Sequence, residues 1–408
     1  MFEKLANMKV FRDPIHGYVH VDLRIIWELI DTFEFQRLRR IHQLGGTYQV
    51  YHTAEHTRFS HSLGVYEIVY RMVHEVEDLK RELSDFEKVC VMVAALLHDI
   101  GHGPFSHVFE PIFDTNHEEY TVQIITGNTM IRKILDKYDQ RIAPNVAMII
   151  NHTHPNELLT QLVSGQLDAD RMDYLLRDSY FTGTSYGNYD LERVLRTLRV
   201  VDGKLVVKES GIHTIEDYIM SRYHMYWQVY YHPLSRCYEE IVKAFFKRLR
   251  YLYDQDPTSI EGFPMFLPFI IEHPVPVEKY IQLDEPASFY GISLATKHTD
   301  KILSDLARRI LERDLFAVET YVDQELEEAR RVAVRDAGYD LEYYFHVDET
   351  IQIPYKPYAS KDSDTIMVLR ENGECKELSL VSNIVAAIVK GEVKDEKKMF
   401  YPKRIIKK

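Results

Sequence analysis

The spacing of hydrophobic and polar positions predicts a chain made mainly of α-helices. Residues 86–97 become apolar on all sides toward their C-terminal end, which predicts a central helix buried by its neighbours. Residues 63–76 form a further helical stretch, and helical patterns dominate from there to about residue 250. Between residues 299 and 337 the pattern predicts a pair of amphipathic helices.

Short β-hairpins interrupt this helical pattern. Residues 9–21 alternate apolar and polar positions around a Pro and a Gly, which predicts a hairpin. Asp202-Gly203 between two β-branched runs predicts a type I′ turn. Asn372-Gly373 predicts another hairpin, in a small α/β appendage at the end of the chain.

Local signals also mark where helices begin and where segments connect. Asp31 with Glu34 three residues later resembles a capping box, which would begin a helix. Gly45-Gly46 should end that helix. Residues 257–290 carry several prolines and predict a connecting region.

Composition excludes several classes of protein. The 408 residues include 45% hydrophobic residues, which is enough apolar surface to exclude wholesale disorder. Sixty-three acidic against 50 basic residues give a net charge of −13, which argues against a broad surface for nucleic acid. Three cysteines without a C-x-x-C motif fit a reducing compartment and argue against a disulfide framework or a thiolate zinc site.

No targeting or membrane segment is predicted. The N-terminus has no apolar core of signal-peptide length, and the longest apolar run, residues 89–97, is too short to cross a bilayer. We therefore expect a soluble cytoplasmic protein with no membrane partner.

Histidines concentrate in one part of the chain. Nine of the 19 fall between residues 42 and 117, namely His42, His52, His56, His61, His74, His98, His102, His107 and His117. His98-Asp99 ends the predicted buried helix and is followed by Gly101 and Gly103, which let backbone approach a ligand closely. An isolated His-Asp pair is more often a capped helix end. Here His61 upstream and Asp170 downstream also lie in helical patterns, which favours a shared site over a simple cap.

An ordered series of motifs resembles the HD-domain phosphohydrolases. The motifs lie between Lys9 and about residue 245 and include DPIHG, FQRLR, QLGG, RFSHSLGV, LLHDIGHGPFSH, DADRMDYLLRD and YYH. The match is closest to the deoxynucleotide triphosphohydrolase branch, which includes the animal SAM-and-HD-domain enzyme and bacterial dGTP-activated relatives. It implies an HD-domain helical bundle with short β-hairpins over residues 1–250. After residue 250 the resemblance is weaker, and the sequence pattern predicts a helical extension or oligomerisation region over 251–340 and a small α/β region with a basic tail over 341–408.

The resemblance implies a metal site and a shell of catalytic residues. The ligands that it implies are His61, His98, Asp99 and Asp170. Two imidazoles and two carboxylates suit a divalent Mn, Fe, Zn, Ni or Mg ion, and ligand types alone do not choose among them. The implied catalytic residues are His102, His107, Glu110, His117 and Glu118. Among these we expect His107 or His117 to donate a proton to the leaving 5′-oxygen, with Glu110 and Glu118 orienting the imidazoles.

A dNTP is the substrate that the resemblance implies, and hydrolysis would give deoxynucleoside and inorganic triphosphate. Arg58, Arg171 and Arg222 are expected to hold the phosphates. Tyr174 and Asp178 are expected to contact the sugar. The remaining expected contacts are Gln43 and Leu44 at the sugar edge and base, and Tyr230 and Tyr231 closing the pocket.

A second nucleotide site is implied as well. Relatives of this branch are tetramers activated by GTP or dGTP at a subunit interface, so we expect a homotetramer with a guanine nucleotide effector. The matching residues are Lys9, Asp31, Gln36 and Arg39, with Arg199 and Lys208 at a second effector position. Asp31 can accept from guanine N1 and N2, and as a residue type it also suits a helix N-cap.

Two other functions remain open at this point. One is a different HD chemistry, a nucleotide monophosphatase or a cyclic-nucleotide phosphodiesterase, which leaves several of the motifs without a role. The other is a sensor that binds a nucleotide or, through a basic and flexible chain end, nucleic acid. That end contains Lys397, Lys398, Lys403, Arg404, Lys407 and Lys408.

Overall fold

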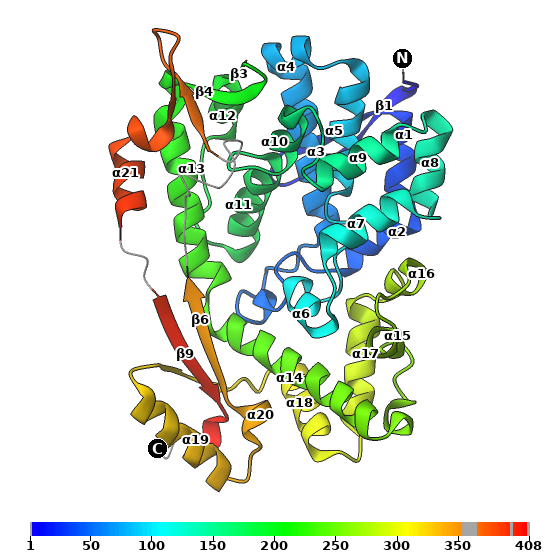
Figure 1. The fold of residues 1–408 in the computed structure, drawn as a ribbon, viewed down its shortest axis with the longest axis vertical. Coiled ribbons are helices and arrows are strands. Elements are labelled where there is room, and N and C mark those ends of the chain that lie inside the picture. The colour runs from blue at the N-terminus through cyan, green and yellow to red at the C-terminus, as the bar shows by residue number, and fades with distance from the viewer. Residues whose placement is uncertain (1, 352–364, 392–394, 406–408) are drawn as a thin grey trace.

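The computed structural model describes residues 2–351, 365–391 and 395–405, and its fold is mainly helical, as predicted (Figure 1). The helices of its first half are α1 (Arg24–Ile30), α2 (Phe33–Arg37), α3 (Arg58–Glu75), α4 (Glu77–Glu82), α5 (Asp85–Leu97), α6 (Phe109–Phe113), α7 (His117–Thr126), α8 (Met130–Tyr138), α9 (Ile142–Ile150), α10 (Glu157–Val163), α11 (Ala169–Thr182) and α12 (Leu191–Thr197). Those of its second half are α13 (Ile212–Met225), α14 (Pro233–Gln255), α15 (Leu267–Ile271), α16 (Val277–Tyr280), α17 (Glu285–Ala295), α18 (Lys301–Glu312), α19 (Gln324–Asp336), α20 (Leu341–Tyr344) and α21 (Asn383–Lys390).

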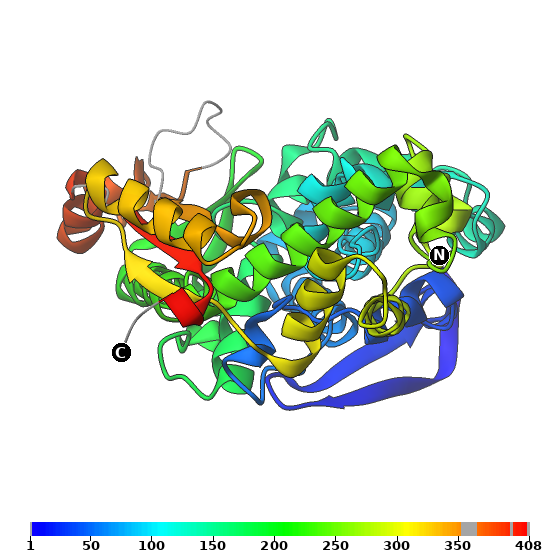
Figure 2. The same cartoon turned by 90° about the horizontal axis from the view of Figure 1, so that it is seen from below.

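The strands form three small sheets. They are β1 (Lys4–Asp13), β2 (Gly17–Leu23), β3 (Leu198–Val201), β4 (Lys204–Lys208), β5 (Ala317–Thr320), β6 (His346–Ile351), β7 (Met367–Leu369), β8 (Cys375–Glu377) and β9 (Asp395–Tyr401). β1 and β2 form the predicted N-terminal hairpin, which lies along one long edge of the molecule (Figure 2). The other sheets have the strand orders β3-β4-β7-β8 and β5-β9-β6.

One hydrophobic core organises the first half of the chain. The predicted central helix, α5, begins behind a capping box formed by Ser84 and Glu87, and every residue from Val89 to Leu97 is buried. It packs against α3, α9 and α10, and α3 packs in turn against α11. The helix is apolar on all sides because neighbours cover all of them.

A second core is built around α14, which packs against α18 and α20. Its buried residues include Phe246, Phe266 and Phe316. Phe105 and Phe109, from the segment that follows α5, also belong to this second core rather than to the first. The chain after α5 therefore leaves one core and is anchored on the other.

Both Asx-Gly hairpins are confirmed. Asp202 and Gly203 have φ values of 51° and 72°, the left-handed pair that a type I′ turn needs, and they join β3 to β4. β7 and β8 form the second hairpin, and β7 pairs in parallel with β4. The small C-terminal hairpin is thus attached to a strand of the helical domain.

Part of the expected basic tail, Lys397 and Lys398, belongs to a paired strand, which corrects the expectation for these two residues. Lys397 and Lys398 lie in β9, the central strand between β5 and β6, and Met399 and Phe400 in the same strand are fully buried. Lys407 and Lys408 lie outside the described residues. The three residue ranges expected as regions stay a prediction, because strands after residue 340 pair with strands from both earlier ranges.

Two local predictions were wrong in detail. Thr32 caps α2 by accepting from the amide of Phe35, so Asp31 and Glu34 do not form a capping box. α2 ends at Arg37, well before Gly45, because a 3-10 turn follows it. The predicted pair of amphipathic helices is confirmed as α18 and α19, with β5 between them. Among the described residues, no helix combines the length and apolar character needed to span a membrane.

Candidate metal centre and active site

Four side chains from three elements converge on one point. His61 comes from α3, His98 and Asp99 follow the end of α5, and Asp170 lies in the first turn of α11. His61 Nε2 is 3.0 Å from Asp170 Oδ1 and 3.3 Å from His98 Nε2. Asp99 Oδ1 is 3.4 Å from His98 Nε2, and Asp99 Oδ2 is 3.8 Å from His61 Nε2.

The opposite ring nitrogens fix how both imidazoles are turned. His61 Nδ1 donates to Asp173 Oδ2 at 2.8 Å, and His98 Nδ1 donates to the carbonyl of Ala95 at 2.9 Å. Both Nε2 atoms are thereby directed at the shared point, the arrangement typical of histidines that bind a metal.

The charges at this point fit a divalent cation. Burial lowers the pKa of His61, but hydrogen bonds to Asp170 and Asp173 raise it overall to about 10. Burial raises the pKa of Asp170, yet its hydrogen bonds with His61 and His98 hold that pKa below the usual range. The two imidazole nitrogens face each other between two ionised carboxylates, so this point attracts positive charge. A mixed set of nitrogen and oxygen ligands suits a first-row transition metal.

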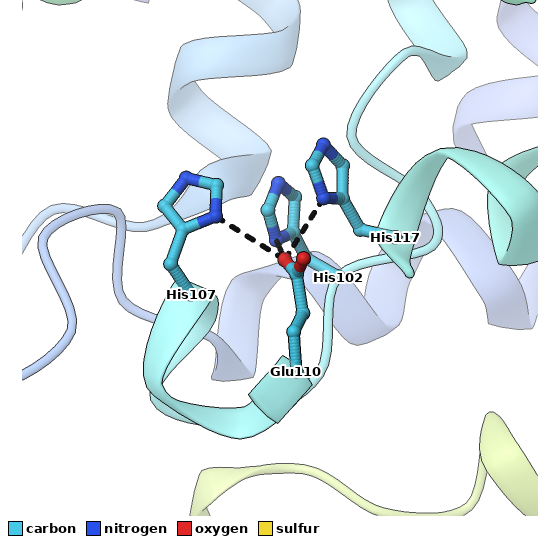
Figure 3. Close-up of side chains that lie close together, drawn as sticks. All are labelled: His102, His107, Glu110 and His117. Atoms are coloured by element: carbon cyan, nitrogen blue, oxygen red, sulfur yellow. Dashed lines mark hydrogen bonds and ion pairs between the residues drawn. The ribbon is translucent and has the colours of Figure 1, made fainter. Parts of the chain in front are cut away.

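A second group of histidines surrounds a single carboxylate (Figure 3). Glu110 Oε1 lies 2.9 Å from His117 Nδ1, 3.2 Å from His107 Nδ1 and 3.9 Å from His102 Nδ1. The three Nε2 atoms point away from Glu110, as Figure 3 shows. Burial raises the pKa of Glu110, but the hydrogen bonds from His107 and His117 lower it overall, so the carboxylate is ionised.

Close backbone contacts bring these histidines together. A Cβ on Gly101 would lie 2.1 Å from the carbonyl oxygen of His117, so only glycine lets α7 approach this closely. The rings of His102 and His117 then stack at 3.9 Å between centroids. Arg37, from the FQRLR motif, is completely buried and donates to the carbonyl of His102 at 2.8 Å.

A cavity of about 400 Å³ joins the two groups. Its lining includes Asp99 and Asp170 of the first group and all three histidines of the second. Other predicted residues that line it are Gln43, Leu44, Arg58, Tyr174, Asp178 and Tyr230. This volume is within the usual range for a small-molecule site and can hold a nucleotide.

Arg58 and Asp178 are held by neighbours at the cavity wall. Arg58 is buried and donates to Asp99 Oδ2 at 2.5 Å and to Ser106 Oγ at 3.1 Å. Asp178 accepts from Tyr230 at 2.8 Å and pairs with His56 at 2.7 Å. His56 had no role in the sequence analysis, and it orients a predicted sugar contact from behind.

Several predicted site residues do not line the cavity. Arg171 pairs with Asp168 and the carbonyl of Gly165, and Arg222 donates to Gln166 Oε1 at 3.0 Å. Tyr231 packs edge-on against Tyr226 and Trp227. Glu118 is exposed, and the carboxylate that orients the histidines is Glu110. The expectation that Glu118 also orients an imidazole stays a prediction.

One wall of the cavity was missed by sequence reasoning. Arg236, Glu239 and Lys243 of α14 line it, and Tyr226 joins Tyr230 there from a π-helical turn over Tyr226–Tyr230. Burial raises the pKa of Glu239 to about 7. The spacing of 236, 239 and 243 places these residues on one helix face, but nothing in the sequence says that this face meets a site formed before residue 180.

The predicted effector residues lie outside this cavity. Lys9 is on β1, with its ammonium 5.8 Å from the ring of Trp27. Asp31 is exposed after α1, and Arg39 Nε donates to Gln36 Oε1 at 2.8 Å. The other two expected effector residues, Arg199 and Lys208, are in strands β3 and β4 of a different sheet.

Comparisons with known proteins agree with this geometry. A family model described as HD domain matches residues 58–178, and one described as HD associated region matches residues 189–262. Uncharacterized protein YwfO of Bacillus subtilis is 46% identical over 409 residues, covering 99% of this chain and 94% of that protein.

Relatives that are named for an activity are matched over a smaller share of their own length. Deoxynucleoside triphosphate triphosphohydrolase SAMHD1 of Homo sapiens is 30% identical over 286 residues, which cover 60% of this chain and 45% of that protein. A crystal structure of a phosphohydrolase from Bacteroides thetaiotaomicron superposes with a TM-score of 0.84 at 29% identity, covering 97% of this chain and 100% of that one.

Proposed function

This chain belongs to the HD-domain family of metal-dependent phosphohydrolases, and we propose that it hydrolyses dNTPs to deoxynucleosides and inorganic triphosphate. The observation that carries the proposal is the convergence of His61, His98, Asp99 and Asp170 beside the histidines that surround Glu110, along one cavity of nucleotide size. The 30% identical human relative is named a deoxynucleoside triphosphate triphosphohydrolase, which supports the same substrate class.

The four converging side chains would hold a divalent ion, which supplies a Lewis acid for the phosphoryl oxygens and lowers the pKa of water. Arg58, fixed by Asp99 and Ser106, adds a positive charge for the phosphate. Burial and the nearby Arg58 charge lower the pKa of His102 well below its usual value, so this ring is neutral. His107 or His117, each donating through Nδ1 to Glu110, presents Nε2 to the cavity as the proton donor for the leaving 5′-oxygen.

The sugar would lie against Tyr174. This ring meets Tyr230 edge-on at 6.0 Å, and Tyr230 donates to Asp178. A deoxyribose packed on Tyr174 leaves no room for a 2′-hydroxyl, and the carboxylate of Asp178 would accept from the sugar. Gln43 and Leu44 would contact the sugar edge and the base.

Arg171 and Arg222 stay proposed phosphate ligands, and they need different side-chain positions from those seen here. Both are occupied by Asp168, Gly165 or Gln166, so a bound triphosphate would have to replace these contacts. For Arg222, a polyanion with several charges is a stronger partner than the neutral amide of Gln166, whereas Arg171 would have to exchange the carboxylate of Asp168 as well as a carbonyl.

Activation by GTP or dGTP in a homotetramer is the further part of the proposal. Asp31 is exposed and Thr32 is the N-cap, so its carboxylate is not used for capping and can accept from guanine. Arg39 and Gln36 lie beside each other on the same turn and can reach the O6 and N7 side.

The products of a single reaction test the proposed function. We would incubate the protein with each dNTP and Mn²⁺, with and without GTP, and separate the products by anion exchange. The expected products are deoxynucleoside and triphosphate, formed faster when GTP is present. Release of dNMP with pyrophosphate, or no product from any dNTP under any of these conditions, would refute the proposal.

A further inference from the structure

Behind the converging ligands, one buried carboxylate collects four hydrogen bonds. Asp173 of α11 has no exposed surface. It accepts from His61 Nδ1 at 2.8 Å and from His16 Nε2 at 2.6 Å. Arg177, one turn later on α11, adds two bonds at 2.8 and 2.9 Å. All the acceptor positions of this carboxylate are therefore in use, and its orientation determines that of His61.

One of these partners, His16, comes from the turn between β1 and β2. This turn carries the DPIHG motif, Asp13 to Gly17, to which no function has yet been assigned. Asp13 Oδ1 accepts from the amides of Ile15 and His16 at 2.8 and 3.1 Å, which makes the turn rigid by itself. Asp13 Oδ2 accepts from Arg177 Nη1 at 2.9 Å, so the turn is attached to α11 at two points.

The packing leaves Asp173 no alternative position. Gly64 lies on α3 one turn after His61, and a Cβ there would stand 1.9 Å from Asp173 Oδ1. α3 and α11 therefore touch at this glycine, with the imidazole of His16 closing the remaining side. The ring of His16 is almost fully buried, with 2% of its side chain exposed.

The same hairpin has a second, separate attachment to α3. His20 donates its amide to Glu67 Oε2 at 2.7 Å and contacts Glu67 Oε1 through Nδ1 at 2.9 Å. This contact holds the hairpin in place without touching Asp173. It supplies a matched control for any effect that comes only from loosening the hairpin.

We propose that His16 is a positioning residue for the metal centre: by fixing Asp173 it keeps His61 turned toward the divalent ion, so the N-terminal hairpin turn controls how long that ion is retained. The inference rests on the proposed function of the same site, since it requires an ion held by His61. The DPIHG motif would then act by retaining the ion, a role separate from any contact with the nucleotide.

The test compares ion release from variants of the intact protein. Mn²⁺-loaded wild type, His16→Ala, His16→Gln and His20→Ala would be mixed with excess chelator, and release followed by the absorbance of a metal-chelator complex. His16→Ala should release its ion about 10- to 100-fold faster than wild type, the range for outer partners of metal ligands. His16→Gln keeps a donor toward Asp173 and should remain near wild type, as should His20→Ala.

Gly64→Ala provides a second route if His16→Ala does not fold. Its added methyl should displace Asp173 and speed release in the same way, while the unfolding midpoint in urea of the metal-free form reports any general loss of stability. Release from His16→Ala or Gly64→Ala at the wild-type rate overturns the inference, as does equally fast release from His20→Ala. Wild type that binds no ion overturns it together with the proposed function, whereas a wild type that binds the ion but hydrolyses no dNTP refutes only the proposed function.

Discussion

Two groups of side chains meet at the same cavity, and in each of them one carboxylate orients imidazoles in a different way. Asp173 holds His61 from a position with no exposed surface, inside the packed helices of the first core. Glu110 holds His107 and His117 from a partly exposed position, and the side chain of His107 is 73% exposed. A buried carboxylate gives rigidity, and an accessible one leaves its imidazoles open to solvent and substrate.

The difference matches the two tasks proposed for the clusters. Metal ligands must converge within a few tenths of an ångström, which the helices α3, α5 and α11 of the first core provide. Proton donors must reach a leaving group and exchange protons with water. They lie on a segment whose Phe105 and Phe109 belong to the second core. The site is therefore assembled at the junction of two cores, each supplying one function.

The largest effect should follow from removal of a metal ligand. His98→Asn should lower kcat/KM about 10³-fold, equivalent to about 4 kcal/mol of transition-state stabilisation, because the ion would be lost with it. Metal content by mass spectrometry and the rate of dNTP hydrolysis check this. His74→Asn is the control, since His74 bonds only the carbonyl of Tyr70 on the surface of α3. Full activity in His98→Asn would contradict the assignment of the first group as metal ligands and the second as proton donors.

A smaller loss without loss of the ion should mark the proton donor. His117→Gln or His107→Gln should lower kcat about 10²-fold, the usual scale of general acid catalysis, with metal content unchanged. The variant that also loses the alkaline limb of the pH profile of kcat identifies the donor. If both variants lose their ion instead, the second cluster is part of the metal site.

The contact between the two cores should respond to pH. Burial lowers the pKa of His42, but hydrogen bonds to Glu285 and Glu55 raise it overall to about 9. Because the folded-state pKa is above the ordinary value of 6.5, the pair adds stability below pH 6.5 and loses it as pH rises through about 9.

His42→Gln should therefore cost on the order of 2 kcal/mol at pH 6, after allowance for solvent screening, and close to nothing above pH 9. Urea unfolding across this pH range measures the difference. His52→Gln, an exposed histidine of the same loop, is the control and should show no such trend. If the loss of unfolding free energy in His42→Gln does not depend on pH, the charge of His42 does not stabilise its contact with Glu285.

The smallest effect should come from the carboxylate of the second cluster. Glu110→Gln keeps the shape but removes the charge that orients His107 and His117, and should lower kcat about tenfold with little change in KM. Glu110→Asp keeps the charge and should be less impaired. Equal losses in both variants would show that side-chain length, rather than charge, positions the imidazoles.

The sequence predicted the elements with regular patterns and the residues with distinctive chemistry. The all-apolar run identified α5, and the Asx-Gly pairs identified two hairpins. The motif resemblance named the four side chains that converge. Capping and element ends were less predictable, because Thr32 or Asp31 can cap a helix equally well and the fold selects one.

Contacts between distant segments could not be predicted from the sequence. Arg236 and Glu239 join the cavity only because α14 passes beneath a site formed much earlier in the chain. The role of His56 depends on its contact with Asp178, which lies 122 residues away along the chain.

The sequence by itself determined that this chain folds mainly into helices and that it carries the ligands of an HD-type metal site, because helical periodicity and donor chemistry are local properties. Only the tertiary structure decided which carboxylate orients which imidazole. In the sequence, Asp173 and Glu110 are both acidic residues about one helical turn from another site residue, Asp170 and His107 respectively. What separates them is burial, which depends on packing between helices that the sequence places far apart.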